Sequence, residues 1–435
     1  MKVCDRSLLK RKPILENDRH LRAVTEILAE VRARGDSAVR ALTARFDHVT
    51  VDGFPVAEAA FAAARAHVAP ETLEALRLAS RRLESFHRQQ PVHSWFTSAL
   101  GGVLGQRVVP LRRVGCYVPG GTAPLPSTVL HTVTLARVAG VREIVVVTPP
   151  NPAYAATGYV NPVVLAAAEI AGATEVLRVG GAQAVAALAF GTETIKPVDK
   201  IVGPGNVYVT LAKKLVYGVV GLDGLAGPTE TVVIADEAAN PEWVAADLLA
   251  QAEHDVLASA ILLTPSEPLA RSVQSSIINH LESLPRADII AQTFDHNSGI
   301  VLTRDIAEAV ALANEYAPEH LCLAVRDPWA WADKITCAGG VFLGEQSFEV
   351  LGDYVAGPSH VMPTGGSARF ASPLTVLDFV RLTSLVALDA DTTQRIAPHA
   401  ARLAEAEGLN AHALAALMRG GKGEEGSPPP SSFLT

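Results

Sequence analysis

Short apolar runs that alternate with Ala-rich helical segments limit the possible folds of this chain more than any other feature. Ile144–Thr148, Glu175–Val179 and Lys200–Val202 are strand-like, and each is followed by Gly or Pro. Between them, residues 163–171 and 182–190 are expected to form crossover helices. Continuous apolar strands with Gly or Pro at their carboxyl ends are typical of a parallel sheet buried on both faces. The pattern predicts a Rossmann-like α/β domain.

The same alternation begins again further along the chain, so a second α/β domain is predicted. Asn240-Pro241 opens one of its helices with an N-cap and a Pro in the first turn. Helical spacing of apolar residues predicts helices over 19–90 and again over 376–420, whereas residues 91–105 are expected to be loop-rich. The remaining strands are expected at 106–110, 231–235, 259–263, 300–303, 321–325 and 340–343.

Charge and cysteine content exclude several classes of protein. The formal net charge is -8, with acidic and basic residues interspersed, which argues against nucleic acid or an anionic membrane as partner. The four cysteines contain no CxxC pair, so neither a structural zinc knuckle nor a disulfide framework is expected. With no apolar leader at the N-terminus and no apolar run of about 20 residues, a soluble cytoplasmic protein is expected.

Polar residues with metal-binding potential occur at three places. Gln251 and His254 are three residues apart at a helix end, where they can share a metal or where His254 can simply cap the helix. Asp353 and His360 flank a Gly-rich loop and can either converge on a pocket or serve as a turn cap and a surface residue. Glu407 and His412 lie in the last helical region, where an exposed amphipathic helix is the alternative.

Glu319 and His320 follow Ala317-Pro318 and come directly before a buried strand. An imidazole exchanges a proton near neutral pH, and an adjacent carboxylate can activate water. The two side chains are therefore either an acid–base pair or a solvated polar turn.

Gly-rich turns follow three of the strands, and Tyr117, Gln183 and Asn206 lie in or beside them. Such turns let the backbone approach a ligand, and the helix N-termini that follow favour a phosphate. No GxGxxG is present, and turns of this kind also occur in α/β sheets that bind nothing.

Taken together, these segments resemble the histidinol dehydrogenase family over about residues 20–415. The matching stretches occur in family order. They are VGCYVPGGTAPLPSTVL, VGGAQAVAALAFGTE, VDKIVGPGNVYVT, AGPTE, LLAQAEHD, NEYAPEHL, GDYVAGPSHVMPTGGSARFASPL and EGLNAH.

The resemblance implies oxidation of L-histidinol through L-histidinaldehyde to L-histidine with two NAD, the last step of histidine biosynthesis. It implies one zinc ion per subunit, which anchors the substrate and is held by Gln251, His254, Asp353 and His412. Two imidazoles, a carboxylate and an amide, without Cys, are typical of a zinc site that also binds substrate.

The resemblance also implies the roles of the remaining residues. His320 accepts the alcohol proton, and Glu319 activates the water that hydrates the aldehyde. The implied NAD contacts are Tyr117, Gln183 and Asn206. The implied substrate contacts are Thr229, His360 and Glu407, together with His320 and the four metal-binding residues.

Two positions depart from the common family pattern: Thr229 replaces a frequent Ser, and Ser359 replaces a frequent Asn. Neither change removes a role, although either can alter substrate affinity. Cys116 precedes Tyr117, but we expect it to be a small buried side chain rather than a nucleophile.

The family further implies an intertwined homodimer in which Glu407 and His412 complete the site of the partner. The expected domains comprise an N-terminal segment, a discontinuous α/β domain with the metal-binding and catalytic residues, an inserted NAD-binding domain, a C-terminal helical dimer arm and a disordered tail. Their expected ranges are 1–18, 19–116 with 231–374, 117–230, 375–420 and 421–435.

Three other functions are compatible with parts of the pattern. A related zinc-dependent dehydrogenase would act on another small polar alcohol, whereas the segment around His360 and the presence of Glu407 favour histidinol. A zinc hydrolase would turn over without NAD. A non-catalytic metabolite-binding protein would be expected to lack Glu319 or His320, and both are present.

Overall fold

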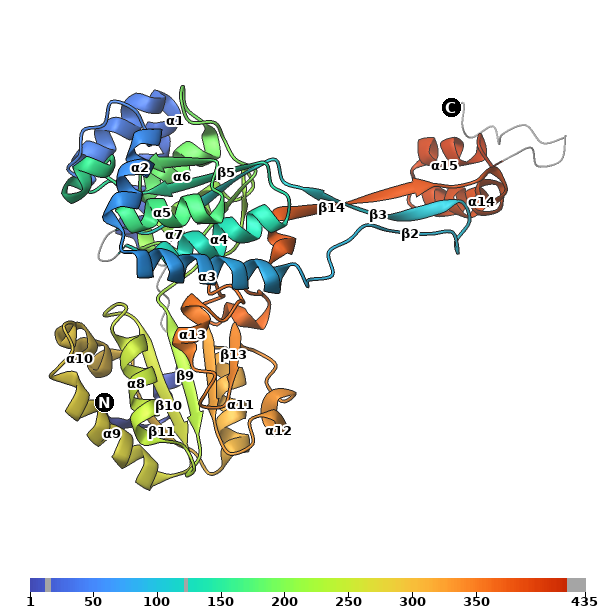
Figure 1. Ribbon diagram of the computed structural model, residues 1–435. Coiled ribbons are helices and arrows are strands. Elements are labelled where there is room, and N and C mark those ends of the chain that lie inside the picture. The colour runs from blue at the N-terminus through green and yellow to red at the C-terminus, as the bar shows by residue number, and fades with distance from the viewer. Residues whose placement is uncertain (12–16, 121–123, 421–435) are drawn as a thin grey trace. The chain divides into compact units, whose positions relative to one another are not determined.

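The computed structural model describes residues 1–11, 17–120 and 124–420, which fall into two compact units (Figure 1). The larger unit contains residues 1–90 and 110–379 and includes two parallel sheets. The smaller unit combines residues 91–109 with the described residues from 380 onward. The expected tail, 421–435, lies outside the described residues.

The first parallel sheet of the larger unit has five strands in the order β6-β5-β4-β7-β8. All four pairings between neighbours are parallel. Chain order therefore runs outward from β4 to β6 and then returns to the other side of β4 with β7. The strands are β4 (Arg113–Tyr117), β5 (Glu143–Thr148), β6 (Glu175–Arg178), β7 (Lys200–Val202) and β8 (Gly221–Leu222).

Helices cover both faces of this sheet because its strands are apolar on both sides. Val145 and Val147 pack against one layer of helices, whereas Ile144 and Val146 pack against the other. The first layer contains α1 (Asp18–Phe46), α6 (Gly181–Phe190) and α7 (Val207–Val216). The second contains α2 (Glu58–His67), α3 (Pro70–His87), α4 (Pro126–Val138) and α5 (Pro162–Ala171).

The second parallel sheet has six strands in the order β1-β11-β10-β9-β12-β13. The strands are β1 (Val3–Cys4), β9 (Glu230–Ala235), β10 (Ser259–Thr264), β11 (Gly299–Leu302), β12 (His320–Ala324) and β13 (Gly340–Leu343). One face packs against α8 (Pro241–Ala252), α9 (Glu267–Leu281) and α10 (Ala287–His296), and the other packs against α11 (Ile306–Tyr316).

The shorter helices of the larger unit are α12 (Trp329–Ala332), α13 (Glu349–Tyr354), η1 (Arg6–Leu9), η2 (Pro152–Thr157), η3 (Ser367–Arg369) and η4 (Val376–Phe379).

The predicted α/β fold with two parallel sheets is confirmed. The N-cap at the start of α8 is also confirmed, since the Asn240 side chain accepts a hydrogen bond from the backbone N–H of Glu242. The short strand β1 was missed by the sequence analysis, because two residues are too few to show a periodic pattern. None of the helices in the described ranges combines the length and the apolar character needed to cross a membrane.

The smaller unit contains a three-stranded sheet in the order β14-β3-β2, with two helices. Its elements are β2 (Trp95–Thr97), β3 (Val103–Pro110), β14 (Val380–Ala387), α14 (Ala390–Ala406) and α15 (Asn410–Leu417). The prediction of helix from residue 376 onward is therefore wrong for β14, and the loop expected over 91–105 contains β2. No side chain of β14 is fully buried, so this strand lacks the apolar signal of a core strand.

The helices α1, α2 and α3 pack on a different sheet from the one expected. The sequence analysis grouped residues 19–116 with the domain that carries Glu319 and His320, but these helices pack against α4 to α7 of the five-stranded sheet. Strand β4 belongs to that same sheet. Helical spacing shows which face of a helix is apolar but does not show which sheet that face covers.

A glycine interrupts the first long helix and brings a buried carboxylate against the five-stranded domain. Gly35 has φ +51, and Asp36 follows it with only 5% of its surface exposed. The Asp36 carboxylate accepts hydrogen bonds from the hydroxyls of Thr192 at 2.6 Å and Thr194 at 2.8 Å. Burial alone would raise the pKa of Asp36, but these hydrogen bonds and the charge of Arg40 lower it below its ordinary value.

We predict that Asp36→Ala lowers the free energy of unfolding by about 2 kcal/mol at neutral pH, because the hydroxyls of Thr192 and Thr194 lose their buried acceptor. Since the pKa is lowered in the folded state, this stabilisation is fully present above about pH 4 and declines as the pH falls through the folded pKa. Urea unfolding at several pH values measures it. The exposed Asp52→Ala is the control, and equal losses in the two variants would contradict the prediction.

Candidate active site

The start of strand β12 holds the predicted acid–base pair beside the start of β9. In the parallel ladder His320 lies opposite Thr231, so Glu319 comes next to Glu230. Both side chains are buried, with 7% of Glu319 and 3% of His320 exposed. The alternative of a solvated polar turn is therefore wrong for these two residues.

Two hydrogen bonds hold the carboxylate of Glu319, and both end on the same oxygen. Oε2 accepts from the hydroxyl of Thr229 at 2.6 Å and from the backbone N–H of Glu230 at 3.1 Å. Burial raises the pKa of Glu319 to about 7, although His320 and these hydrogen bonds oppose the rise. A carboxyl group with this pKa exchanges its proton near neutral pH.

The imidazole of His320 has one nitrogen directed at the backbone and one without a partner. Nδ1 lies 3.3 Å from the carbonyl oxygen of Glu230, to which it can donate. Nε2 is buried, has no hydrogen-bond partner among the described residues and lies 3.6 Å from a carboxylate oxygen of Asp353. Neutral His320 with its proton on Nδ1 therefore presents Nε2 as a proton acceptor.

Carboxylates surround this imidazole. Oxygens of Glu349 and Glu319 lie 3.6 Å and 3.8 Å from its Nδ1. Burial disfavours protonation, but charge from Glu349, Glu319 and Asp353 outweighs it and raises the pKa of His320 well above its ordinary value.

Glu349 is a residue of the cluster that the sequence analysis missed. It is four residues before Asp353 on α13, is 3% exposed and accepts a hydrogen bond from the hydroxyl of Thr231. Burial and the neighbouring Asp353 raise its pKa. The spacing of two carboxylates by four residues was the available signal, because such residues lie on one helical face.

His360 is held from three sides. Its Nδ1 lies 2.8 Å from the carbonyl oxygen of Asp353, its backbone N–H donates to Nδ1 of His131, and its ring stacks on the His131 ring with centroids 4.1 Å apart. Nε2 is 3.5 Å from the hydroxyl of Thr128. The structure therefore places His360 beside Asp353 and not on an isolated surface turn.

The departure at Ser359 has a structural explanation. Its hydroxyl donates to the carbonyl oxygen of His131 and accepts from the N–H of Val361, so it braces the loop that carries His360.

Gln251 and His254 present groups that fit a metal. Gln251 is fully buried, and its Nε2 has no partner in the described part of the chain. Thr229 gives its only proton to Glu319, so a reversed amide lets Nε2 of Gln251 donate to the Thr229 oxygen and leaves Oε1 free as a ligand. His254 follows the end of α8, and its Nδ1 lies 3.1 Å from the Ala250 carbonyl, which leaves Nε2 available.

Asp353 supplies a carboxylate to the same region. Burial alone would raise its pKa, but His320, His360 and His254 lower it, so the group is ionised. Over the ranges that the structure describes, no cluster of three or more His, Cys, Asp or Glu side chains is arranged to hold a metal. The larger unit offers one amide, one imidazole and one carboxylate from the predicted set.

The other two predicted residues belong to the smaller unit. Glu407 is the C-cap of α14, and His412 lies in α15. Both side chains are exposed, as an amphipathic surface helix would also leave them.

Tyr117, Gln183 and Asn206 lie at the carboxyl edge of the five-stranded sheet: Tyr117 ends β4, Gln183 is in the first turn of α6 after β6, and Asn206 is the N-cap of α7 after β7. The hydroxyl of Tyr117 accepts from the N–H of Gly181, and the Asn206 side chain caps α7. Strand order reverses between β4 and β7, and ligands of open α/β sheets bind at such points. These hydrogen bonds also stabilise the turns by themselves, so the shape of the turns does not require a bound ligand.

The thiol of Cys116 is fully buried, and burial raises its pKa to about 12. A thiolate nucleophile is therefore disfavoured. The interpretation of Cys116 as a small buried side chain is confirmed.

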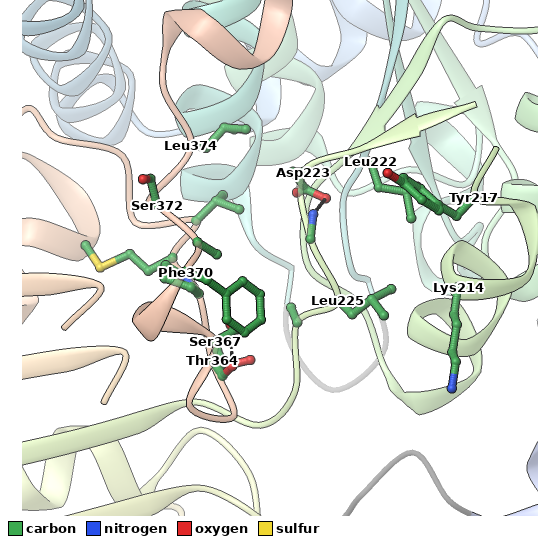
Figure 2. A pocket seen from close by; sticks show the side chains of 16 residues that line it. Lys214, Tyr217, Leu222, Asp223, Leu225, Thr364, Ser367, Phe370, Ser372 and Leu374 are labelled. Carbon is green, nitrogen blue, oxygen red and sulfur yellow. Dashed lines mark hydrogen bonds between the residues drawn. The ribbon is translucent and has the colours of Figure 1, made fainter. Parts of the chain in front are cut away.

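A separate cavity of about 370 Å³ lies between residues 222–226 and 361–374 (Figure 2). Its lining is mostly apolar and includes Leu225, Phe370 and Leu374. None of the predicted site residues lines it. The polar cluster around His320 is thus distinct from this cavity.

Comparisons with known proteins identify the family of this chain. A family model described as histidinol dehydrogenase matches residues 10–420. Relatives named histidinol dehydrogenase from Moorella thermoacetica and Deinococcus radiodurans are each 52% identical and cover 91% of this chain, and 93% and 90% of their own lengths. The one from Aquifex aeolicus is 49% identical and covers 95% of both chains.

A solved structure gives the same result. The crystal structure of histidinol dehydrogenase from Elizabethkingia anophelis superposes with a TM-score of 0.90 at 37% identity, covering 95% of this chain and 94% of its own. The resemblance seen in the sequence is thereby confirmed, and the chain belongs to the histidinol dehydrogenase family.

Proposed function

We propose that this protein oxidises L-histidinol through L-histidinaldehyde to L-histidine, with transfer of two hydrides to NAD, as the last step of histidine biosynthesis. The observation that carries the proposal is the buried pair at the start of β12, in which Nε2 of His320 and Oε1 of Glu319 have no hydrogen-bond partner among the residues that the structure describes. These are the two bases that a four-electron oxidation of an alcohol requires, one for each step. Membership of the histidinol dehydrogenase family supports histidinol as the substrate.

His320 acts in the first step. Its Nδ1–H is directed at the Glu230 carbonyl, so Nε2 accepts the alcohol proton while the hydride leaves the carbon atom. Because the neutral ring is required and surrounding carboxylates raise the pKa of His320, alcohol oxidation is favoured at alkaline pH.

Glu319 acts in the second step. Thr229 and the N–H of Glu230 occupy Oε2, so Oε1 is the atom that takes a proton from the water which hydrates the aldehyde. The pKa of about 7 leaves enough carboxylate at neutral pH for this role.

Zinc, when bound, would anchor the imidazole and amine of the substrate as a Lewis acid. Gln251, His254 and Asp353 would hold it from the larger unit, with His412 of a second subunit as the fourth ligand and Glu407 of that subunit touching substrate. Thr229 and His360 of the larger unit would also bind the substrate. NAD, when bound at Tyr117, Gln183 and Asn206, would accept the hydrides.

The overall proposal predicts the stoichiometry. About two NADH should form per histidinol consumed, because alcohol to carboxylate is a four-electron oxidation. Removal of the metal with a chelator should abolish histidinol binding while NAD still binds, as calorimetry with each ligand can measure. One NADH per histidinol, or turnover without NAD, would rule the proposal out in favour of a simple alcohol dehydrogenase or a hydrolase.

Separate half-reactions test the two bases. His320→Asn should slow histidinol oxidation about 100-fold or more, because the proton acceptor is lost. Glu319→Gln should leave that step measurable but slow histidinaldehyde oxidation by a similar factor. In the wild type the aldehyde rate should rise with pH through about 7, since only ionised Glu319 accepts the proton, and Glu319→Gln should remove this rise.

Both steps should be followed by NADH formation in single turnovers, with each substrate supplied separately. Asp52→Ala, an exposed carboxylate outside the site, is the control. Equal losses in the two half-reactions for both base variants would contradict the division of roles.

Subunit mixing tests the shared site. His254→Ala and His412→Ala should each be inactive, because each removes one zinc ligand from every site. Refolding the two variants together should restore part of the activity, since a mixed dimer then contains one intact site. If the mixture stays inactive while each variant remains dimeric by light scattering, His412 does not serve the partner's site.

A further inference from the structure

Arg11 lies just after η1 in the N-terminal segment, and its guanidinium holds the turn that leads to Glu319. Its Nε and a terminal nitrogen lie 3.1 Å and 2.7 Å from the carbonyl oxygen of Tyr316, and that nitrogen is 3.2 Å from the carbonyl oxygen of Ala317. The guanidinium carbon is 3.9 Å from the centre of the Tyr316 ring. The planar group is thus held by hydrogen bonds in its plane and by an aromatic ring on its face.

The same guanidinium forms a bidentate ion pair with both carboxylate oxygens of Glu230. One oxygen also accepts the N–H of Gly365, and only 6% of Glu230 is exposed. A bidentate pair of this kind fixes direction as well as distance, which a lysine at the same place cannot do.

Arg11 is linked through Glu230 to both proposed bases. The N–H of Glu230 binds Oε2 of Glu319, and the carbonyl oxygen of Glu230 faces Nδ1 of His320. One residue therefore touches both side chains through its backbone while Arg11 holds its carboxylate.

The turn held by Arg11 is strained. Ala317 ends α11 with φ +51, a left-handed conformation that alanine rarely adopts. Pro318 and Glu319 follow it directly. Hydrogen bonds from Arg11 to the carbonyl oxygens of Tyr316 and Ala317 offset this strain and set the direction in which the chain enters β12.

We propose that Arg11 is a positioning residue for both half-reactions, acting through Glu230 and the turn at Ala317. The inference rests on the proposed roles of Glu319 and His320. Because Arg11 acts only through Glu230 and this turn, its loss should change the rate of the chemical steps and leave binding of histidinol and NAD nearly unchanged.

Arg11→Lys is the decisive variant, because it keeps the positive charge and the aliphatic stem but removes the planar fork. Its kcat should fall about tenfold or more for both histidinol and histidinaldehyde, since small displacements of reacting groups have effects of this size. KM for each substrate, and the thermal midpoint, should stay close to those of the control. Arg11→Met, which also removes the charge, should lose more activity.

Arg6→Met is the matched control. Arg6 lies in the same N-terminal segment and pairs with Glu308, away from the bases, and 59% of its side chain is exposed. This variant measures the effect of losing an arginine ion pair between the N-terminal segment and the rest of the larger unit. All proteins are compared as zinc-loaded full-length enzyme, by steady-state rates with each substrate and by thermal unfolding.

The outcomes separate cleanly. If kcat of Arg11→Lys matches that of Arg6→Met in an active wild-type background, or if only KM or the thermal midpoint changes, the inference is overturned and the proposed function stands. If Arg11→Met does not fold, the kcat and KM of Arg11→Lys decide. A wild-type protein without histidinol-dependent NADH formation would overturn the proposed function itself.

Discussion

The parallel pairing of β9 with β12 determines the geometry of the whole candidate site. It places His320 opposite Thr231, so the peptide of Glu230 lies between the two bases and contacts each of them. Two further contacts build on that register: Thr229, which precedes Glu230, binds Glu319, and Thr231 holds Glu349 beside His320. A shift by one residue would turn the base at position 320 toward the opposite face of the sheet.

The candidate residues lie at opposite edges of the two parallel sheets. Tyr117 and Asn206 lie at the carboxyl ends of their strands, where open α/β sheets usually bind ligands, whereas Glu319 and His320 lie at the amino end of β12. At that edge the returning helices supply side chains from their C-termini, as α8 does with Gln251. Glu230 is the first residue of β9, and its backbone groups contact side chains at this edge. Its N–H donates to Glu319, and its carbonyl oxygen faces Nδ1 of His320.

Much of the fold could be predicted because buried strands such as β5 carry a continuous apolar run, here Ile144–Val147, that ends shortly before a Pro. The strand β14 could not, since no side chain on it is fully buried, and the assignment of α1 to a sheet depends on partners far away in the sequence. Single residues such as Glu319 gave an even choice until family resemblance linked them to other motifs. Arg11 could not be predicted because an isolated arginine carries no pattern, and only the folded chain shows what it contacts. Glu349 did carry a signal, its spacing of four residues from Asp353, but that spacing alone does not show that it lies against His320.

The joining of distant chain segments has a consequence for synthesis of this protein. The strands β2 and β3 leave the ribosome long before β14, the strand with which β3 pairs, and β1 waits for β11. Arg11 likewise has no carboxylate to grip until Glu230 has emerged. Early segments therefore remain without their final neighbours while most of the chain is made, a period in which unpaired strand edges are open to association with other nascent chains.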